Sequence, residues 1–185
     1  MDAPVKQRLA WGITGSGHYL RECLEIIHGL GNVDLFLSAA AAEVLSMYGH
    51  EVAKLRAEIR VFRDTTASSV PVEFFYHGHY HTVVIAPATS NTVAKMVYGI
   101  SDTLATNIYA QAGKCRVPSI VFACDTQPEV ESEAPEGMVM VYPRKIDLEN
   151  AEKLKTFEAT TVVEDMAALK QAIDARLKCL NIFSS

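Results

Sequence analysis

The sequence predicts an α/β fold: a three-layer Rossmann-like (flavodoxin-like) arrangement in which helices cover both faces of a mostly parallel sheet. Two observations predict it. Apolar segments of strand length alternate with longer segments whose apolar residues recur at helical spacing. The strand segments are also apolar throughout, which is typical of strands buried on both faces. Because 49% of the 185 residues are hydrophobic, we expect one domain over residues 1–185 with a sizeable core.

The first half of the chain contains short apolar runs separated by two longer helical patterns. The expected strands and strand pieces are residues 8–14, 33–38, 58–64 and 71–75. Helices are expected over 15–30, with Leu20, Leu24 and Ile27 at helical spacing, and over 39–56, with an interruption near Gly49.

The second half continues the alternation. Buried strands are expected at 82–87, 117–123 and 137–143, with a last strand at 160–163. The helices expected there are two segments after Pro87 that divide near 99–101, a short helix over 147–157 with Asp147 as its cap, and a closing helix over 164–180. Residues 125–137 are rich in Pro and Glu and are expected to form a loop.

Composition excludes several classes of function. The net charge is −5 without a block of like charges, which argues against nucleic acid as the main partner. The cysteines at 23, 115, 124 and 179 have neither zinc nor iron–sulfur spacing, so we expect reduced thiols in a cytoplasmic protein. No secretory signal and no run long enough to span a bilayer is evident, so no membrane partner is expected.

The residues that follow the strands are the candidates for a ligand site, because open parallel sheets bind ligands beyond the carboxyl ends of their strands. The first strand is followed by Gly15, Ser16 and Gly17. Glycines permit a tight turn and a close approach of a ligand, and the helix that follows offers free N–H groups to a phosphate. The alternative is an ordinary strand-to-helix turn capped by Thr14 or Ser16. Neither the dinucleotide nor the P-loop fingerprint is present.

A second cluster of small polar residues follows the central strand at residues 82–87. It consists of Ala88, Thr89, Ser90, Asn91 and Thr92. One such residue suffices for a helix cap, so the remainder are available to hydrogen-bond a flat polar ring or a phosphate. The alternative is a capped helix with incidental polar neighbours. Ser38 follows the second strand, and Cys124 and Asp125 follow the strand at 117–123.

Other residues have weaker readings. His77, His79 and His81 alternate, but Gly78 interrupts them at the amino-terminal entry to a strand, so we expect a solvated loop and no metal site. Cys124 is either a reactive thiol or a core residue. Asp125 and Arg144 are either ligand contacts or surface residues.

Taken together, these motifs resemble the homo-oligomeric flavin-containing cysteine decarboxylase superfamily. That superfamily has a Gly-Ser-Gly-like turn, a serine after the second strand and a PxSANT-like cluster, which correspond here to 15–17, Ser38 and PATSNT at 87–92. With APATSNTVAKMVYGISDTLATN and PRKIDLENAEKLKTFE, the chain looks most like the branch of archaeoflavoproteins and dihydromethanopterin reductases.

The resemblance implies a bound FMN with its phosphate on Gly15, Ser16, Gly17 and Ser38. It implies that the flavin ring lies near Thr89–Thr92, and that Asp102 reaches a flavin bound mostly by another chain of a homotrimer or an assembly of trimers. The catalytic histidine of the decarboxylases is absent, since Glu73 stands in that region and His77 is out of register. Their later substrate segment is also missing, which disfavours decarboxylation.

The function expected from the resemblance is an FMN-dependent oxidoreductase that reduces 7,8-dihydromethanopterin to the tetrahydro form by hydride transfer. The reductant is NAD(P)H or an electron-donor protein, and the proton donor is left open among Asp125, Glu73 and solvent. The alternatives are an electron-transfer flavoprotein with a protein partner, for which the acidic stretch 129–136 is a hint, a non-redox prenyltransferase or decarboxylase, and a flavin-binding protein without turnover.

Overall fold

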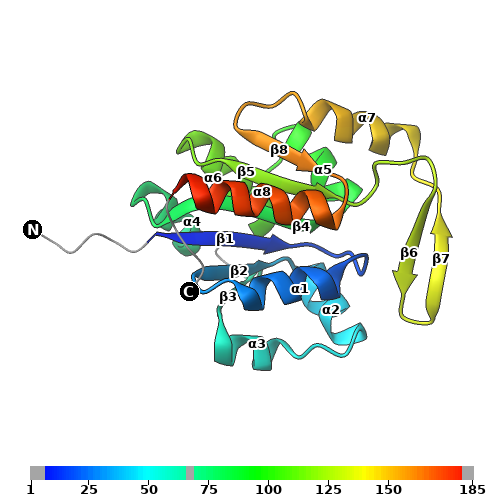
Figure 1. Cartoon of the computed structure of the whole chain (residues 1–185), viewed down its shortest axis with the longest axis horizontal. Helices are drawn as coiled ribbons and strands as arrows, with labels where there is room; N and C mark the ends of the chain where they lie inside the picture. Colours follow the sequence, from blue (N-terminus) through cyan, green and yellow to red (C-terminus); the bar gives the residue numbers. More distant parts are fainter. Residues whose placement is uncertain (1–6, 66–68, 181–185) are drawn as a thin grey trace, which may run out of the picture.

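Six parallel strands form the central sheet of the computed structural model, which describes residues 7–65 and 69–180 (Figure 1). Their order across the sheet is β3-β2-β1-β4-β5-β8. The strands are β1 (Arg8–Ile13), β2 (Val33–Leu37), β3 (Arg60–Arg63), β4 (Tyr80–Ala88), β5 (Ser119–Ala123) and β8 (Thr160–Val163). The predicted fold class is therefore confirmed. Residues 1–6, 66–68 and 181–185 of the predicted domain lie outside the described residues.

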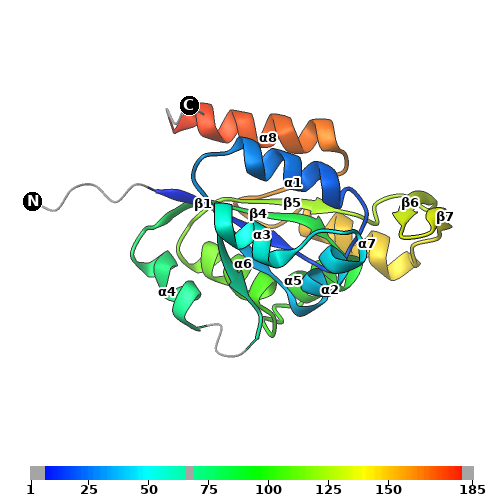
Figure 2. The ribbon, with the colours of Figure 1, turned by 90° about the horizontal axis from the view of Figure 1, so that it is seen from below.

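Helices cover both faces of this sheet (Figure 2). One face packs against α1 (Leu20–Gly29), α2 (Ala39–Met47), α3 (Val52–Glu58) and α8 (Met166–Cys179). The other face packs against α4 (Ser69–Tyr76), α5 (Ser90–Val97), α6 (Leu104–Lys114) and α7 (Lys145–Leu154). Within the described residues, no helix has the length and apolar character that crossing a membrane requires.

Alternate residues of each strand enter the two cores because side chains on a strand point to opposite faces. Along β1, Leu9, Trp11 and Ile13 pack on the α1 and α8 side, and Ala10 packs on the other. The Trp11 indole is fully buried and donates a hydrogen bond to the Ala86 carbonyl at 2.7 Å. This bond fastens β1 to β4 at the centre of the sheet.

One predicted strand is a helix. Residues 71–75 belong to α4, with Pro71 in its first turn and with Val72 and Phe75 buried on one side. A short apolar run does not distinguish a strand from a buried helix turn, and proline is tolerated at the start of a helix.

A second prediction was wrong about burial. Residues 137–143 contain a strand, β7 (Gly137–Val141), but it pairs antiparallel with β6 (Val130–Ala134) in a separate hairpin. The loop expected at 125–137 is therefore also wrong in part, because β6 lies within it. The hairpin stands away from the body beyond the carboxyl ends of the sheet strands (Figure 1). Its apolar side chains are exposed from Met138 to Tyr142. Apolar composition alone does not say which other element covers a strand.

Helix starts also differ from the prediction. The first helix begins at Leu20 because residues 14–19 form the turn, with Tyr19 in the left-handed conformation at φ 54°. α7 begins before Asp147, whose carboxylate instead accepts a hydrogen bond from the Arg144 backbone N–H at 2.9 Å.

Candidate functional site

The candidate site lies where the strand order changes direction. From β1 the chain proceeds outward to β2 and β3, and then returns to the opposite side of β1 to build β4, β5 and β8. The loops after β1 and β4 therefore diverge, and such a switch point forms the ligand crevice of open α/β sheets. The two polar clusters found in the sequence are these two loops.

Thr14 joins these loops. Its buried hydroxyl donates to the Pro87 carbonyl at 2.7 Å and accepts from the Thr89 backbone N–H at 3.0 Å. Each loop is thus held in place by the other, and a ligand that binds one meets the other at a fixed distance. Thr14 is a positioning residue between the strands and not a cap of the helix that follows.

The Gly-Ser-Gly turn needs both glycines for reasons of space. A Cβ at Gly15 would lie 2.6 Å from the Ala40 Cβ, and a Cβ at Gly17 would lie 2.1 Å from the Tyr48 hydroxyl oxygen. The Tyr48 hydroxyl donates a hydrogen bond to the Glu133 carbonyl at 2.8 Å, and this bond would be lost if the side chain moved aside. The turn is a backbone cradle that side chains would fill.

Helix starts gather at the same edge. Ser38 caps α2 by accepting from the Ala41 N–H at 3.0 Å, and Thr89 caps α5 by accepting from the Thr92 N–H at 3.3 Å. Helix starts carry unpaired N–H groups and a positive dipole end, which favours an anion. Ser38 also lines a hollow of about 620 Å³ together with Arg63 and Asp64, so a guanidinium accompanies the helix starts.

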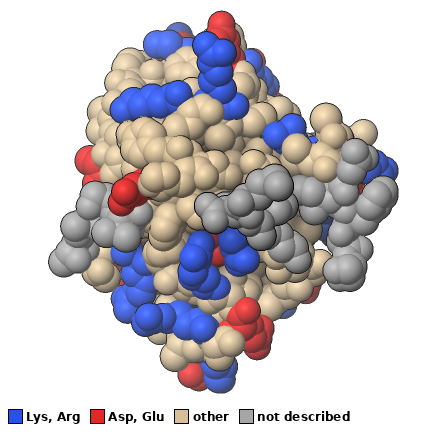
Figure 3. All heavy atoms as spheres, turned by 90° about the vertical axis from the view of Figure 1, so that its left-hand side faces the viewer, with Lys and Arg blue, Asp and Glu red and all other residues tan. Residues whose placement is uncertain are grey.

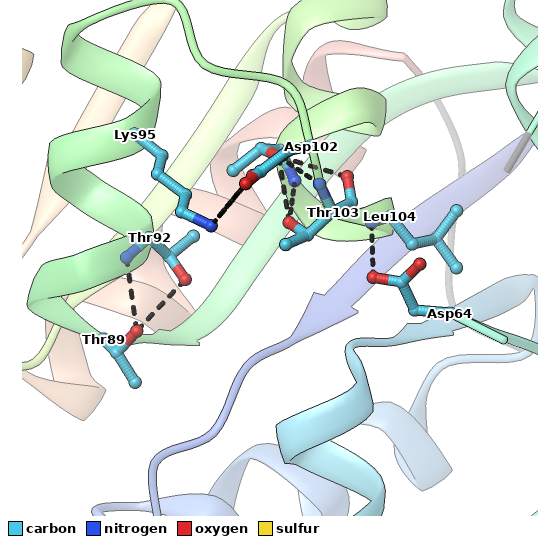
Figure 4. Close-up of polar contacts among 8 residues, drawn as sticks. Asp64, Thr89, Thr92, Lys95, Asp102, Thr103 and Leu104 are labelled. Atoms are coloured by element: carbon cyan, nitrogen blue, oxygen red, sulfur yellow. Dashed lines mark hydrogen bonds and ion pairs between the residues drawn. The ribbon is translucent and has the colours of Figure 1, made fainter.

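The Thr-Ser-Asn-Thr cluster divides into two pairs. Thr89 and Thr92 serve the helix, since their hydroxyl oxygens lie 3.1 Å apart and Thr92 is buried (Figure 4). Ser90 is half-buried and Asn91 is exposed in the first turn. Capping therefore accounts for two of the four residues, and the other two are open to a ligand.

Ala88, Cys124 and Asp125 border this crevice on the β5 side. The Ala88 side chain is buried and its carbonyl accepts from the Cys124 N–H at 3.0 Å. The Cys124 thiol donates to the Ser16 hydroxyl oxygen at 3.5 Å, and burial raises the pKa of that thiol to about 12. Cys124 is therefore a neutral, buried hydrogen-bond donor under the turn, which favours the core reading over a reactive thiolate.

Asp102 is paired with a lysine of α5. Its carboxylate lies 2.8 Å from the Lys95 Nζ of α5, and this hydrogen bond lowers the pKa of Asp102 (Figure 4). The neighbouring start of α6 is held by Asp64, which accepts from the Leu104 N–H at 2.8 Å. The chain's own fold brings Asp102 to the α5–α6 connection and not to the Gly-Ser-Gly turn.

The remaining sequence candidates lie elsewhere. His77 and His79 stand at the amino end of β4, and His81 is buried within it, where burial lowers its pKa to about 4. Among residues 7–65 and 69–180, no group of three or more His, Cys, Asp or Glu side chains is suited to hold a metal ion. The Arg144 guanidinium is bound to the carboxylate of Asp147.

Sequence reasoning did not single out His18, Glu22 or Arg63. His18 directly follows the Gly-Ser-Gly turn, and its position after a strand–turn unit was the available signal. Glu22 lies one helical turn further on. Arg63 became a neighbour of Ser38 only because β3 pairs with β2.

Comparisons with known proteins indicate a family and agree with the fold. Residues 2–181 match the model of the Flavoprotein family. Burkholderia xenovorans DmrB, solved in complex with FMN and described as a cubic protein cage for redox transfer, is 55% identical. The similarity covers 97% of this chain and 99% of that chain, with a TM-score of 0.89.

Curated relatives point the same way at lower identity. A dihydromethanopterin reductase (acceptor) of Methanosarcina mazei is 39% identical over 70% of this chain, which spans 59% of that enzyme. An uncharacterized protein of Methanocaldococcus jannaschii is 35% identical over 90% of this chain and 94% of its own length. A phenylacrylic acid decarboxylase of Aquifex aeolicus, 21% identical with a TM-score of 0.65, shares the fold.

Proposed function

The chain belongs to the Flavoprotein family, and from this premise we propose that it is an FMN-dependent oxidoreductase that reduces a dihydropterin. The cofactor is FMN, the flavin in the complex of the 55% identical relative. The acceptor we propose is 7,8-dihydromethanopterin, which becomes tetrahydromethanopterin. The reductase names of the Methanosarcina and Methanocaldococcus relatives support this choice of acceptor.

The carboxyl edge of the sheet fits the phosphate of FMN. The observation that carries the proposal is the cradle at Gly15 and Gly17, in which a Cβ would collide with Ala40 or Tyr48. We assign the phosphate to the turn residues 15–17 and to Ser38, whose positions combine free backbone space with a helix start. No lysine of a P-loop is needed for this mode of binding.

The second loop suits the flavin ring. We assign the ring to Ala88 and to Thr89–Thr92, with Ser90 and Asn91 supplying polar atoms that helix capping does not use. Cys124 and Asp125 would border the ring from the β5 side, and Asp102 would meet the flavin of a neighbouring copy. Reduced FMN supplies the hydride, and the protein's contribution is to orient the acceptor and to deliver a proton.

Self-assembly is part of the proposal. We infer a homotrimer or an assembly of trimers, which agrees with the description of the Burkholderia relative as a cage. The hairpin adds support from this chain, because the side chains of Met138, Met140 and Tyr142 are each more than half exposed. Exposed apolar groups in succession are typical of a surface that another protein covers. Light scattering after gel filtration tests this inference, and a monomer at micromolar concentration contradicts it.

The reductant we propose is NAD(P)H or an electron-donor protein. A second function, electron transfer to a protein without pterin reduction, is favoured by the acidic residues on and around the hairpin. These residues are Glu129, Glu131, Glu133 and Glu136. An acidic face steers a basic partner towards a redox centre.

A two-step experiment separates the two functions. The FMN-loaded protein is reduced without oxygen and is then mixed with dihydromethanopterin while the flavin absorbance is followed. We expect the absorbance of oxidised flavin to return together with tetrahydromethanopterin. A reduced flavin that persists with the pterin and is reoxidised only by an electron-acceptor protein supports the second function instead.

A further inference from the structure

A groove of about 540 Å³ lies between the start of α1, the end of β5 and the hairpin. Residues of all three elements line it, including His18, Glu22, Cys124, Thr126, Glu129 and Met138. It begins at the Gly-Ser-Gly turn, because the His18 backbone N–H and the Cys124 thiol both donate to the Ser16 hydroxyl oxygen, at 3.2 and 3.5 Å. A molecule in this groove would lie beside the turn assigned to FMN.

The imidazole of His18 lies in the wall of this groove, next to the phenol ring of Tyr19. The side chain is half-buried, and its ring centroid lies 4.0 Å from that of Tyr19. In the part of the chain that the structure describes, neither ring nitrogen has a hydrogen-bond partner. The ring lies tilted against that of Tyr19, at an interplanar angle of 56°, and its nitrogens remain available.

Carboxylates from each neighbouring element act on this ring. They belong to Glu22 of α1, Asp125 after β5 and Glu133 of β6, the last also within 3.6 Å of the Arg21 guanidinium. Glu129, Glu131 and Glu164 complete the acidic lining. The Glu22 Oε2 atom is buried and has no hydrogen-bond partner among the described residues. A buried carboxylate oxygen without a partner is costly, so a donor is expected there in the working protein.

We propose that His18 is the proton donor to the dihydropterin, and that the carboxylate of Glu22 stabilises its imidazolium. This inference rests on the proposed function. Reduction of the pterin C=N bond requires two electrons, which arrive with the hydride that reduced FMN supplies to carbon, and one proton on nitrogen. The imidazolium of His18 gives its N–H proton to that nitrogen as the π bond becomes the new lone pair, and solvent reprotonates the ring.

The pH dependence follows from the environment of the ring. Burial lowers the pKa of His18 below its usual value of 6.5, against the opposing effect of the three carboxylates. The donor form therefore decreases as the pH rises through that lowered pKa. The rate at which dihydropterin reoxidises the reduced flavin is expected to be highest in acid and to fall towards neutral pH.

The test compares H18Q with H28Q, the same substitution at a histidine of α1 that lies outside the groove. Flavin reoxidation by dihydropterin is measured in a single turnover across pH. We expect H18Q to react about 100-fold or more slowly in acid and to lose the pH dependence, and H28Q to behave like the unchanged protein. E22Q should keep the pH dependence but shift its midpoint to lower pH, because one carboxylate that favours the imidazolium is gone.

A second readout does not depend on turnover. The imidazole NMR signals of the FMN-loaded, oxidised protein are followed while a fully oxidised, unreactive pterin is added. We expect saturable shifts for His18 and none for His28. If the unchanged protein reacts with dihydropterin but H18Q keeps its rate and pH profile, or the pterin leaves the His18 signals unmoved, the inference about His18 is wrong and the proposed function stands. If dihydropterin does not reoxidise the unchanged protein, both are wrong.

Discussion

The two ends of the central sheet are both polar, but in opposite ways. At the amino end, Asp34 is fully buried and accepts hydrogen bonds from Arg8 at 2.6 Å, from Tyr80 at 2.8 Å and from the Arg60 guanidinium. Figure 3 shows this end of the molecule, where Lys and Arg side chains are spread over the surface. The carboxylate there is saturated by groups of the same chain, so the network stabilises the fold and leaves nothing for a ligand.

At the carboxyl end of the sheet, polar groups also gather, but several of them lack a hydrogen-bond partner in the described part of the chain. The hydroxyls of Ser38 and Thr89 each accept a hydrogen bond from one backbone N–H of the helix that follows. The Ser16 hydroxyl oxygen accepts two hydrogen bonds from nearby groups. Ser90, Asn91 and the ring nitrogens of His18 keep hydrogen-bonding capacity that residues 7–65 and 69–180 do not use. Polar residues therefore mark a ligand site when they lack hydrogen-bond partners, and not merely when they cluster.

The largest expected effect is on the amino end. D34N removes the charge that Arg8 and Arg60 share and should lower the free energy of unfolding by about 3–5 kcal/mol, measured by denaturant titration. The exposed D174N is the matched control and should change stability by less than about 0.5 kcal/mol. FMN affinity measured without denaturant should be unchanged. Equal stabilities of D34N and D174N would contradict the interpretation that the Asp34 network stabilises the fold.

Stability should also depend on pH through the amino end. The folded pKa of His81 is about 4 against about 6.5 when unfolded, so the unfolded chain binds more protons between these values. Stability is therefore fully present above pH 6.5 and is lost as the pH falls towards 4, by about 2–3 kcal/mol. H81Q should remove that part of the pH dependence, whereas the exposed H77Q should not. An identical pH profile for H81Q and the unchanged protein would refute this assignment.

At the carboxyl end, G15A should act mainly on FMN. The added Cβ would lie 2.6 Å from the Ala40 Cβ, so the turn must shift, at a cost of about 1–3 kcal/mol. FMN affinity, measured by quenching of flavin fluorescence, should fall about 10- to 100-fold. Gly29, at the end of α1, has nothing within 4 Å of an added Cβ, so G29A is the control and should bind FMN normally.

The smallest effect sharpens the assignment of the phosphate. S38A loses the cap of α2, which should cost about 1 kcal/mol of stability. It should weaken FMN several-fold while leaving riboflavin affinity unchanged, because riboflavin lacks the phosphate. Equal losses for the two flavins would mean that Ser38 does not contact the phosphate.

Most of the fold was predictable because strands that are buried on both faces of a sheet consist almost entirely of apolar residues. The runs at 82–87 and 117–123 correctly indicated central strands, since an apolar run between turn signals has few other uses. Residues 71–75 were mistaken for a strand because five residues are too few to separate the two periodicities. The start of the first helix was placed too early because the turn at 14–19 carries no breaker beyond its glycines.

The candidate site was predictable only in part. Residues 15–17, Ser38 and 88–92 were found because each follows a strand, and parallel strands bring their carboxyl ends to one edge. Asp102 was included through the family resemblance, and its binding to Lys95 depends on how the α5–α6 connection turns. Arg63 was missed because its proximity to Ser38 arises from strand pairing and not from sequence distance.

The alternation of strands and helices and the loops with small polar residues could be predicted from the residues alone, because hydrophobic periodicity and turn chemistry are local properties. The tertiary structure decided which polar groups find partners. Asp34 meets two arginines and a tyrosine across three strands, whereas His18 and Glu22 face a groove completed by a hairpin more than 100 residues away. Hydrogen-bond saturation depends on contacts between distant segments, and it separates the stabilising end of this sheet from the end that we propose is functional.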